Sequence, residues 1–274
     1  MTLLAHSEAI AASIERGIFG AGELTRLALI AWLSEGHLLL EGMPGTGKTA
    51  FARLLAASLG LELKRVQCTP DLMPGDVLGA NLFDFREQRF TLTQGPVFTE
   101  FLLVDEINRT PPKTQSALLE AMQERRVTID GKSYALPESF FVVATQNPVE
   151  HEGTYPLPEA QLDRFVFKPI ARYPDEALEV SAVLAHPGGP KSASPEALGI
   201  QPVLDRSRLS ELRQAVARVR LDEKVARYIV ALVRHSRTHR SVAVGLSTRA
   251  ATVCGGAARA AAAEIAGNAP LAVR

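Results

Sequence analysis

The sequence has little cysteine, few aromatic residues and no excess of either charge. Only two of its 274 residues are cysteine, Cys68 and Cys254, and they lie too far apart in the chain for a metal-ligand pair. A disulfide framework is therefore not expected, which fits a reducing compartment. Lysine plus arginine and aspartate plus glutamate each number 30, so the formal net charge is zero. Binding of nucleic acid through bulk charge would need a basic chain, so we expect no nucleic-acid partner.

The sequence also lacks a long hydrophobic run. The longest one near the N-terminus, residues 27–33, is too short to cross a bilayer and is closely flanked by Arg26 and Glu35. Glu8 and Glu15 interrupt the region where a signal peptide would need an unbroken apolar core. We therefore expect no integral membrane segment and a cytoplasmic location.

Short apolar segments alternate with amphipathic ones along much of the chain. Strands are expected at 37–41, 63–68, 101–104, 140–144 and, less strongly, 165–167. Helices are expected at 6–16, 22–34, 49–59 and 221–239. Nearly continuous apolar strands are typical of a parallel sheet that is covered on both faces. Strands that alternate with helices indicate an α/β fold.

Two hairpins and a change of composition break this alternation. Residues 81–92 alternate apolar and polar positions around a polar turn, and residues 127–136 do so around Asp130-Gly131, so each is expected to be a β-hairpin. Residues 187–202 are rich in proline, glycine and serine, and the chain beyond 205 has a helical pattern. The predicted organisation is an α/β nucleotide-binding core at 1–180, a linker at 181–204 and a small all-helical domain at 205–274.

Eight consecutive residues match the phosphate-binding pattern G-x-x-x-x-G-K-[ST] in full. They are Gly42, Met43, Pro44, Gly45, Thr46, Gly47, Lys48 and Thr49. Glycines let the main chain wrap around phosphates with its N–H groups turned inward. Lys48 is expected to reach the β and γ phosphates, and the Thr49 hydroxyl to bind Mg²⁺. An expected strand precedes the loop and an expected helix follows it, which makes a turn without a ligand the weaker interpretation.

The strand expected at 101–104 is followed by two carboxylates, Asp105 and Glu106. Asp105 is predicted to hold Mg²⁺ through the metal's water shell, and Glu106 to act as general base on the attacking water. Both lie at the carboxyl end of a strand, where α/β sheets bind ligands. One expected strand separates the two motifs, which indicates the branch of P-loop proteins with an additional strand. No Asn-Lys-x-Asp motif for guanine occurs, so ATP is the expected nucleotide.

Around these motifs the sequence resembles the MoxR-type AAA+ ATPases. The resemblance is carried by the segments TPDLMPGD (69–76), DEINR (105–109), PPKTQ (111–115) and LLEAMQE (118–124), and it covers about residues 15–255. It implies an AAA+ core with a parallel five-stranded sheet and a helical lid, which we expect to be short. The hairpin at 81–92 lies where this family carries its insertion in the second helix. In relatives the two hairpins face the central pore or a partner.

The resemblance also implies roles for three polar residues beyond the acidic motif. Asn147, after the fourth expected strand, is similar to the sensor that hydrogen-bonds the attacking water or the γ-phosphate. Arg164 resembles the arginine finger, which reaches into the nucleotide site of a neighbouring subunit. A local ion pair with Asp163 or Glu159 is the alternative for this arginine. Arg249 resembles the second sensor, although this chain has Ser-Thr-Arg where many relatives have Ser-Pro-Arg. A surface helix arginine is its alternative.

Two residues near the N-terminus, Phe19 and Gly20, lie where the family packs against adenine. The glutamine that usually follows this glycine is Ala21 here. Together with the phosphate loop, these residues complete the predicted ATP site.

The resemblance implies an ATP-hydrolysing homo-oligomer, expected to be a hexameric ring, with ATP and Mg²⁺ as its cofactors. Such a ring would act as a chaperone that remodels or matures a client protein or a metalloenzyme complex. A protein with a von Willebrand factor A domain is the partner that the family suggests. Two alternatives remain: the ATPase subunit of a magnesium or cobalt chelatase, and a nucleotide-gated assembly scaffold with little turnover. The combination of Glu106, Asn147 and Arg164 favours hydrolysis over a pure scaffold.

Overall fold

A five-stranded parallel sheet forms the centre of the molecule, in the order β2-β5-β8-β1-β9. The computed structural model describes residues 3–86, 88–149, 153–185, 194–266 and 272–273. The central strands are β1 (Leu38–Gly42), β2 (Leu63–Gln67), β5 (Phe101–Asp105), β8 (Phe141–Gln146) and β9 (Ile170–Ala171). The α/β fold with a parallel five-stranded sheet is therefore confirmed.

Successive side chains of the central strands pack into two separate cores, because they point to opposite faces of the sheet. Leu38 and Leu40 of β1 belong to one hydrophobic cluster, whereas Leu39 between them belongs to the other. All three are fully buried. The strands β5 and β8 divide their side chains in the same way. A sheet that is buried on both sides explains why these segments are apolar throughout.

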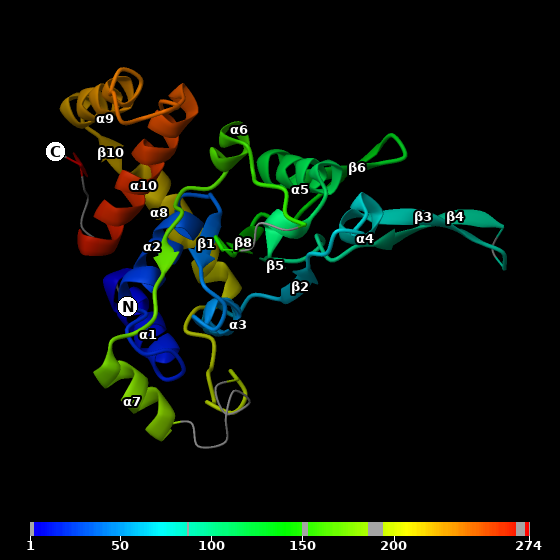
Figure 1. Ribbon diagram of the computed structural model, residues 1–274, viewed down its shortest axis with the longest axis horizontal. Helices are drawn as coiled ribbons and strands as arrows, with labels where there is room; N and C mark the ends of the chain where they lie inside the picture. The colour runs from blue at the N-terminus through cyan, green and yellow to red at the C-terminus, as the bar shows by residue number, and fades with distance from the viewer. Residues whose placement is uncertain (1–2, 87, 150–152, 186–193, 267–271, 274) are drawn as a thin grey trace.

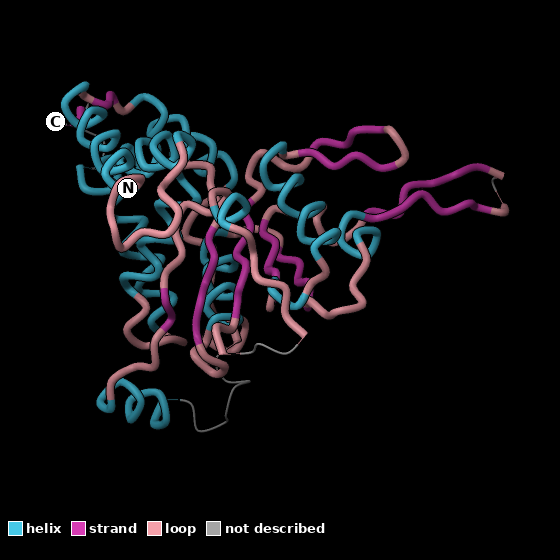
Figure 2. The backbone as a smooth tube through the Cα atoms, turned by 45° about the horizontal axis from the view of Figure 1, so that its top comes forward, coloured by secondary structure: helices cyan, strands magenta, loops and turns pink. Residues whose placement is uncertain are grey.

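Helices flank both faces of this sheet (Figure 2). The first cluster is built on α1 (Leu3–Glu15), α2 (Gly22–Leu33) and α3 (Lys48–Leu59), and α8 (Arg206–Arg218) and α10 (Thr248–Ala266) add to it. The second cluster is covered by α4 (Pro74–Leu78) and α5 (Pro112–Glu124). The C-terminal helices α8 and α10 therefore share one hydrophobic cluster with the layer formed by α1, α2 and α3.

A buried carboxylate anchors α10 on the first two helices. Glu264, near the C-terminal end of α10, is only 4% exposed. It accepts a hydrogen bond from Ser7 Oγ at 2.5 Å and pairs with Arg26 Nε at 3.0 Å. Because a buried carboxylate without partners is costly, these two contacts favour one position of α10 on α1 and α2.

Two antiparallel hairpins leave the body on the side of α5 (Figure 1). They are β3 (Gly79–Asp84) with β4 (Arg89–Gln94), and β6 (Arg126–Ile129) with β7 (Lys132–Ala135). Both predicted hairpins are confirmed. The longer one carries Phe83, Phe85 and Phe90, which are all exposed to solvent. The ring of Phe83 contacts each of the other two at a centroid distance of 5.2 Å. Asn81 Nδ2 donates to Asp130 Oδ2 at 2.8 Å and so links the two hairpins.

The remaining elements are short or lie at the periphery. They are the 3₁₀ turn Ile107–Arg109, α6 (Glu159–Leu162), α7 (Glu176–Ala185), α9 (Glu223–Ser236) and the strand pair β10 (Arg220–Leu221) and β11 (Ala272–Val273). The helix expected at 221–239 is thus shorter at both ends. Within the described ranges, no helix has the length and apolarity to cross a membrane.

The fifth strand lies further along the chain than expected. Phe167 forms only an isolated bridge to Leu38, and the strand itself is Ile170–Ala171. Pro169 separates the two and has no N–H to donate, although its oxygen accepts from the N–H of Glu41 at 3.0 Å. The strand therefore begins five residues later and ends four residues later than the predicted segment 165–167.

The predicted boundaries of the core, linker and helical domain stay predictions. α7 runs to Ala185 and so enters the segment 181–204 expected to be a linker. Residues 186–193 of that segment lie outside the described residues. The described helices beyond 205 are α8, α9 and α10, in agreement with the helical pattern of the sequence. The region is not all helical, however, because the strands β10 and β11 pair within it.

Candidate nucleotide site

The phosphate-binding pattern forms the turn between β1 and α3. Gly45 and Gly47 take φ values of 82° and 78°, which other residues rarely adopt. Gly42 is required for a different reason, since a β-carbon there would lie 2.5 Å from the carbonyl oxygen of Ala171 on β9. α3 begins at Lys48, and no side chain caps its first N–H groups. The turn and the helix end therefore present main-chain N–H groups that suit an anion.

Lys48 turns back over the loop to which it belongs. Its Nζ donates to the main-chain oxygens of Gly42 and Met43 at 2.6 and 2.7 Å. Partial burial lowers the pKa of Lys48 below its usual range, while the charges of Asp105 and Glu106 act in the opposite direction. These carboxylates thus favour the ammonium form, which is the form that binds phosphate.

Asp105 ends β5, and its side chain is only 5% exposed. Its Oδ1 accepts from Thr49 Oγ1 at 3.2 Å and from Thr145 Oγ1 at 3.3 Å. Its Oδ2 accepts from Arg65 Nε at 2.6 Å and lies 3.3 Å from Thr49 Oγ1. A hydroxyl beside a carboxylate offers the hard oxygen ligands that Mg²⁺ prefers, directly or through water. Thr49 and Asp105 therefore fit the metal-binding role predicted for them.

Glu106 occupies a strained turn directly after the strand. Its φ of 59° and ψ of 51° lie in the left-handed region, which a residue with a side chain occupies at a cost. The turn is held by its N–H, which donates to Thr145 Oγ1 at 3.0 Å. Its carboxylate accepts from Gln67 Nε2 at 3.1 Å and lies 3.4 Å from Arg109 Nε. These contacts fix the direction of the carboxylate beside the phosphate loop.

Asn147 follows β8 and is 6% exposed. Its Oδ1 accepts from the N–H of Val149 at 3.2 Å, so the following turn orients the side chain. Asn108 Nδ2 donates to the main-chain oxygen of Asn147 at 3.4 Å and ties this turn to the one after β5.

One cavity, called the phosphate-loop cavity, collects these groups. Its volume is about 460 Å³, and residues 44–50 form one wall. The opposite walls are formed by Arg65, Gln67, Asp105, Glu106, Thr145 and Asn147. The structure thus brings together the side chains predicted for phosphate, metal, general base and first sensor.

The residues predicted to contact adenine line a neighbouring cavity of about 570 Å³, called the Phe19 cavity. Phe19 and Gly20 share its lining with Thr46 of the loop and with residues 169–174. Tyr173 donates from its hydroxyl to the main-chain oxygen of Pro44 at 3.1 Å and so fixes this wall to the loop. Thr46 of the loop thus lines both this cavity and the phosphate-loop cavity.

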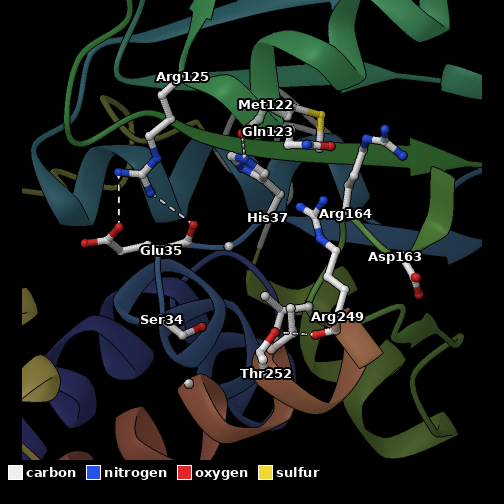
Figure 3. A pocket seen from close by; sticks show the side chains of 14 residues that line it. Ser34, Glu35, His37, Met122, Gln123, Arg125, Asp163, Arg164, Arg249 and Thr252 are labelled. Carbon is white, nitrogen blue, oxygen red and sulfur yellow. Dashed lines mark hydrogen bonds and ion pairs between the residues drawn. The ribbon is translucent and has the colours of Figure 1, made fainter. Parts of the chain in front are cut away.

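Arg164 and Arg249 do not line either of these cavities. They share a separate one of about 340 Å³, the arginine cavity, with Asp163, Arg125 and His37 among its lining residues. Figure 3 shows the two side chains close together in this space, while Arg125 is turned toward Glu35. Arg125 Nη1 lies 3.4 Å from a carboxylate oxygen of Glu35.

Neither Arg164 nor Arg249 forms an ion pair in the described part of the chain. Arg164 Nη1 donates to the main-chain oxygen of Ala160 at 2.7 Å, and its Nε is buried without a partner. The pairing with Asp163 or Glu159, considered as an alternative, is not the contact observed. Arg249 lies in the first turn of α10, where Ser247 Oγ accepts from the N–H of Ala250 at 3.1 Å. Thr248 in place of proline therefore still starts the helix.

Comparison with known proteins identifies relatives of this arrangement. The model of the family described as ATPases associated with various cellular activities (AAA) matches residues 37–167. The Bacillus subtilis protein YeaC, of uncharacterised function, is 48% identical over 238 residues, or 86% of this chain and 72% of YeaC. Chaperone MoxR1 of Mycobacterium tuberculosis is 50% identical over 161 residues, or 59% of this chain and 43% of MoxR1. The chain belongs to the MoxR-type AAA+ ATPases.

A solved structure agrees with this family. The crystal structure of an ATPase candidate from Cytophaga hutchinsonii superposes with a TM-score of 0.84 at 36% identity, covering 96% of this chain and 81% of that one. Protein MoxR of Methylorubrum extorquens is 37% identical over 160 residues. This chain spans 46% of that protein, so it matches less than half the length of the relatives named MoxR.

Sequence reasoning missed several polar residues of this MoxR-type site. Arg65 and Gln67 lie two apart on β2 and so share one face of the strand that pairs with β5. This spacing, next to a strand that ends in two carboxylates, was a signal that they would approach the site. Thr145, two residues before Asn147, supports both Asp105 and Glu106. Tyr173 lies in a loop after β9, and no pattern in the sequence indicated its contact with the phosphate loop.

Proposed function

We propose that this protein binds and hydrolyses ATP with Mg²⁺ and uses the reaction for chaperone-like remodelling or maturation of a partner protein. One observation carries the proposal: Lys48, Thr49, Asp105, Glu106 and Asn147 line the same cavity. A pure scaffold would need the phosphate loop alone, whereas this cavity also holds a carboxylate and an amide suited to an attacking water. The names of the MoxR relatives support the MoxR type over a chelatase subunit.

Each side chain contributes in a way that its position supports. The main-chain N–H groups of the loop and the Lys48 ammonium bind the phosphates. Thr49 and Asp105 hold Mg²⁺, which neutralises charge on the phosphate oxygens when it is bound. Glu106 accepts a proton from the attacking water, and Asn147 orients that water or the γ-phosphate. Phe19 and Gly20 contact the base from the neighbouring cavity.

Arg164 and Arg249 act on the nucleotide of a neighbouring subunit. The support is that both line a cavity separate from the phosphate loop of their own chain. Two arginines without an ion pair in the described residues favour an anion supplied from outside the chain. A homo-oligomeric ring, hexameric as in the family, provides such an anion at every interface. A von Willebrand factor A domain protein is the partner proposed for the ring.

Glu106→Gln tests the hydrolytic part of the proposal. The variant is expected to keep ATP binding and to lose about 10²–10⁴-fold in phosphate release, because an amide cannot accept the proton of water. Glu120→Gln, a carboxylate exposed on α5, is the matched control and should hydrolyse ATP like the wild type. A loss of less than threefold in Glu106→Gln would assign the base to another group. Proteins captured by Glu106→Gln with ATP would identify the partner and client.

A further inference from the structure

We infer that Arg65 competes with Mg²⁺ for Asp105, so that metal binding requires the release of this arginine. The inference rests on the proposed function, since it concerns the metal of the same site. It assigns a positioning role to Arg65, a residue of β2 outside the phosphate loop and the acidic motif.

The acceptor positions of Asp105 are fully used. A carboxylate has two oxygens with about four positions for hydrogen bonds in all. Thr49 and Thr145 approach Oδ1 at 3.2 and 3.3 Å. Arg65 Nε and Thr49 approach Oδ2 at 2.6 and 3.3 Å. A metal ion or a metal-bound water can reach this carboxylate only if one of the three partners moves away.

Arg65 is the partner that has to leave. Thr49 is itself expected to turn its oxygen to the metal and thus stays at the site. Thr145 is fixed on its other side, because its hydroxyl also accepts from the N–H of Glu106 at 3.0 Å. Arg65 is 41% exposed and can turn into solvent. It is also the only cation among the three partners, so it repels Mg²⁺ where the hydroxyls do not.

The arginine is held in place by a second contact. Its Nη2 donates to Gln67 Oε1 at 2.8 Å, and Gln67 Nε2 donates to Glu106 Oε2 at 3.1 Å. Arg65 and Gln67 thus join the two carboxylates of the acidic motif by a continuous chain of hydrogen bonds. When the metal binds and Arg65 leaves Asp105, this chain of hydrogen bonds is broken at its Asp105 end.

The test measures metal affinity without turnover. Binding of a fluorescent, non-hydrolysable ATP analogue is followed against magnesium chloride, and separately in EDTA, for wild type, Arg65→Ala and Arg65→Gln. Arg65→Gln keeps donors to Asp105 but removes the charge, and thermal melting reports whether each variant is folded. Lys64→Ala is the matched control, since Lys64 is a cation of the same strand that donates to the main-chain oxygen of Phe98 instead.

We expect both Arg65 variants to reach half-saturation at a Mg²⁺ concentration lower by about fivefold or more, the size of an ordinary coupling between two sites. Their analogue affinity in EDTA and the behaviour of Lys64→Ala should match wild type. An unchanged Mg²⁺ requirement in folded Arg65→Gln would overturn the competition. Weaker analogue binding both with Mg²⁺ and in EDTA would instead make Arg65 a phosphate contact. Absence of analogue binding by the wild type would overturn the proposed function, and this inference with it.

Discussion

The phosphate-loop cavity and the arginine cavity differ in how their charged side chains are paired. In the first, cations and carboxylates of one chain face each other, and Asp105 pairs with Arg65 at 2.6 Å. In the second, Arg164 and Arg249 share a cavity and form no ion pair in the described ranges. The charged groups of the first cavity are thus paired within one chain, whereas the two arginines of the second are not paired within the described residues. This difference supports the proposal that Arg164 and Arg249 act at the nucleotide of a neighbouring subunit.

The largest effect is expected at the phosphate loop. Lys48→Ala removes the ammonium proposed to bind the β and γ phosphates, so ATP binding measured by calorimetry with Mg²⁺ should be lost. The fold should persist, because within the described ranges Lys48 Nζ donates hydrogen bonds only to main-chain oxygens of its own loop and to a hydroxyl there. Lys113→Ala, an exposed lysine of α5, is the control. Wild-type affinity in Lys48→Ala would contradict the assignment of the loop.

The comparison is tested most directly at Arg164. Arg164→Ala should bind ATP like wild type and lose about 10³-fold or more in turnover, as arginine fingers do in other P-loop enzymes. Mixing Arg164→Ala with Lys48→Ala subunits should restore activity, because some interfaces then join an intact loop to an intact arginine. Phosphate release over a range of mixing ratios and protein concentrations measures this.

Two results would remove the distinction between the two cavities. One is the lack of any rescue on mixing. The other is a specific activity that does not change with protein concentration, as for an active monomer. Arg164 would then be a structural arginine that holds the main chain at Ala160.

A smaller effect is expected at Arg249. If it shares the neighbour's nucleotide with Arg164, Arg249→Ala should lower turnover by about tenfold, the value of one charge-assisted hydrogen bond. Arg227→Ala is the control in the same helical region, since its ion pair with Glu223 is exposed and worth little. Equal rates of phosphate release in the two variants would show that Arg249 does not contribute to hydrolysis. Steady-state phosphate release is the measurement.

The smallest effect concerns the anchor of α10 and separates stability from chemistry. Glu264→Gln removes the charge that pairs with Arg26, and the free energy of unfolding should fall by about 1–3 kcal/mol. Urea unfolding of the variant, compared with Glu8→Gln on the exposed side of α1, measures it. Identical midpoints would mean that the contacts with Ser7 and Arg26 do not stabilise the packing of α10.

The contiguous parts of the site could be predicted from the sequence, and the contacts between distant segments could not. The phosphate loop and the acidic motif are read from local spacing, because each is a strand end followed by a turn. The fifth strand was predicted at the wrong place, because the position of Ile170–Ala171 depends on pairing with β1 and on the missing N–H of Pro169. Arg65 was missed because its partner, Asp105, lies 40 positions away on the neighbouring strand.

The shared cavity of Arg164 and Arg249 could not be predicted for the same reason. The resemblance singled out Arg164 and Arg249 as separate residues with separate roles. Their common cavity depends on the packing of α10 against the body, which no local pattern reports. Thr248, the residue before Arg249, departs from the family pattern. The hydroxyl of Ser247 nevertheless caps the helix, so the start of α10 could be predicted from Ser247 alone.

The anchor of α10 has a mechanical consequence for Arg249. Glu264 is fixed near one end of the helix, and Arg249 lies in its first turn at the other end. At 1.5 Å per residue the two are about 22 Å apart along the axis, so a tilt of about 5° at the anchor displaces Arg249 by about 2 Å. α10 is thus a lever with its pivot on α1 and α2. Small rotations of these N-terminal helices would therefore move Arg249 by ångströms within the arginine cavity.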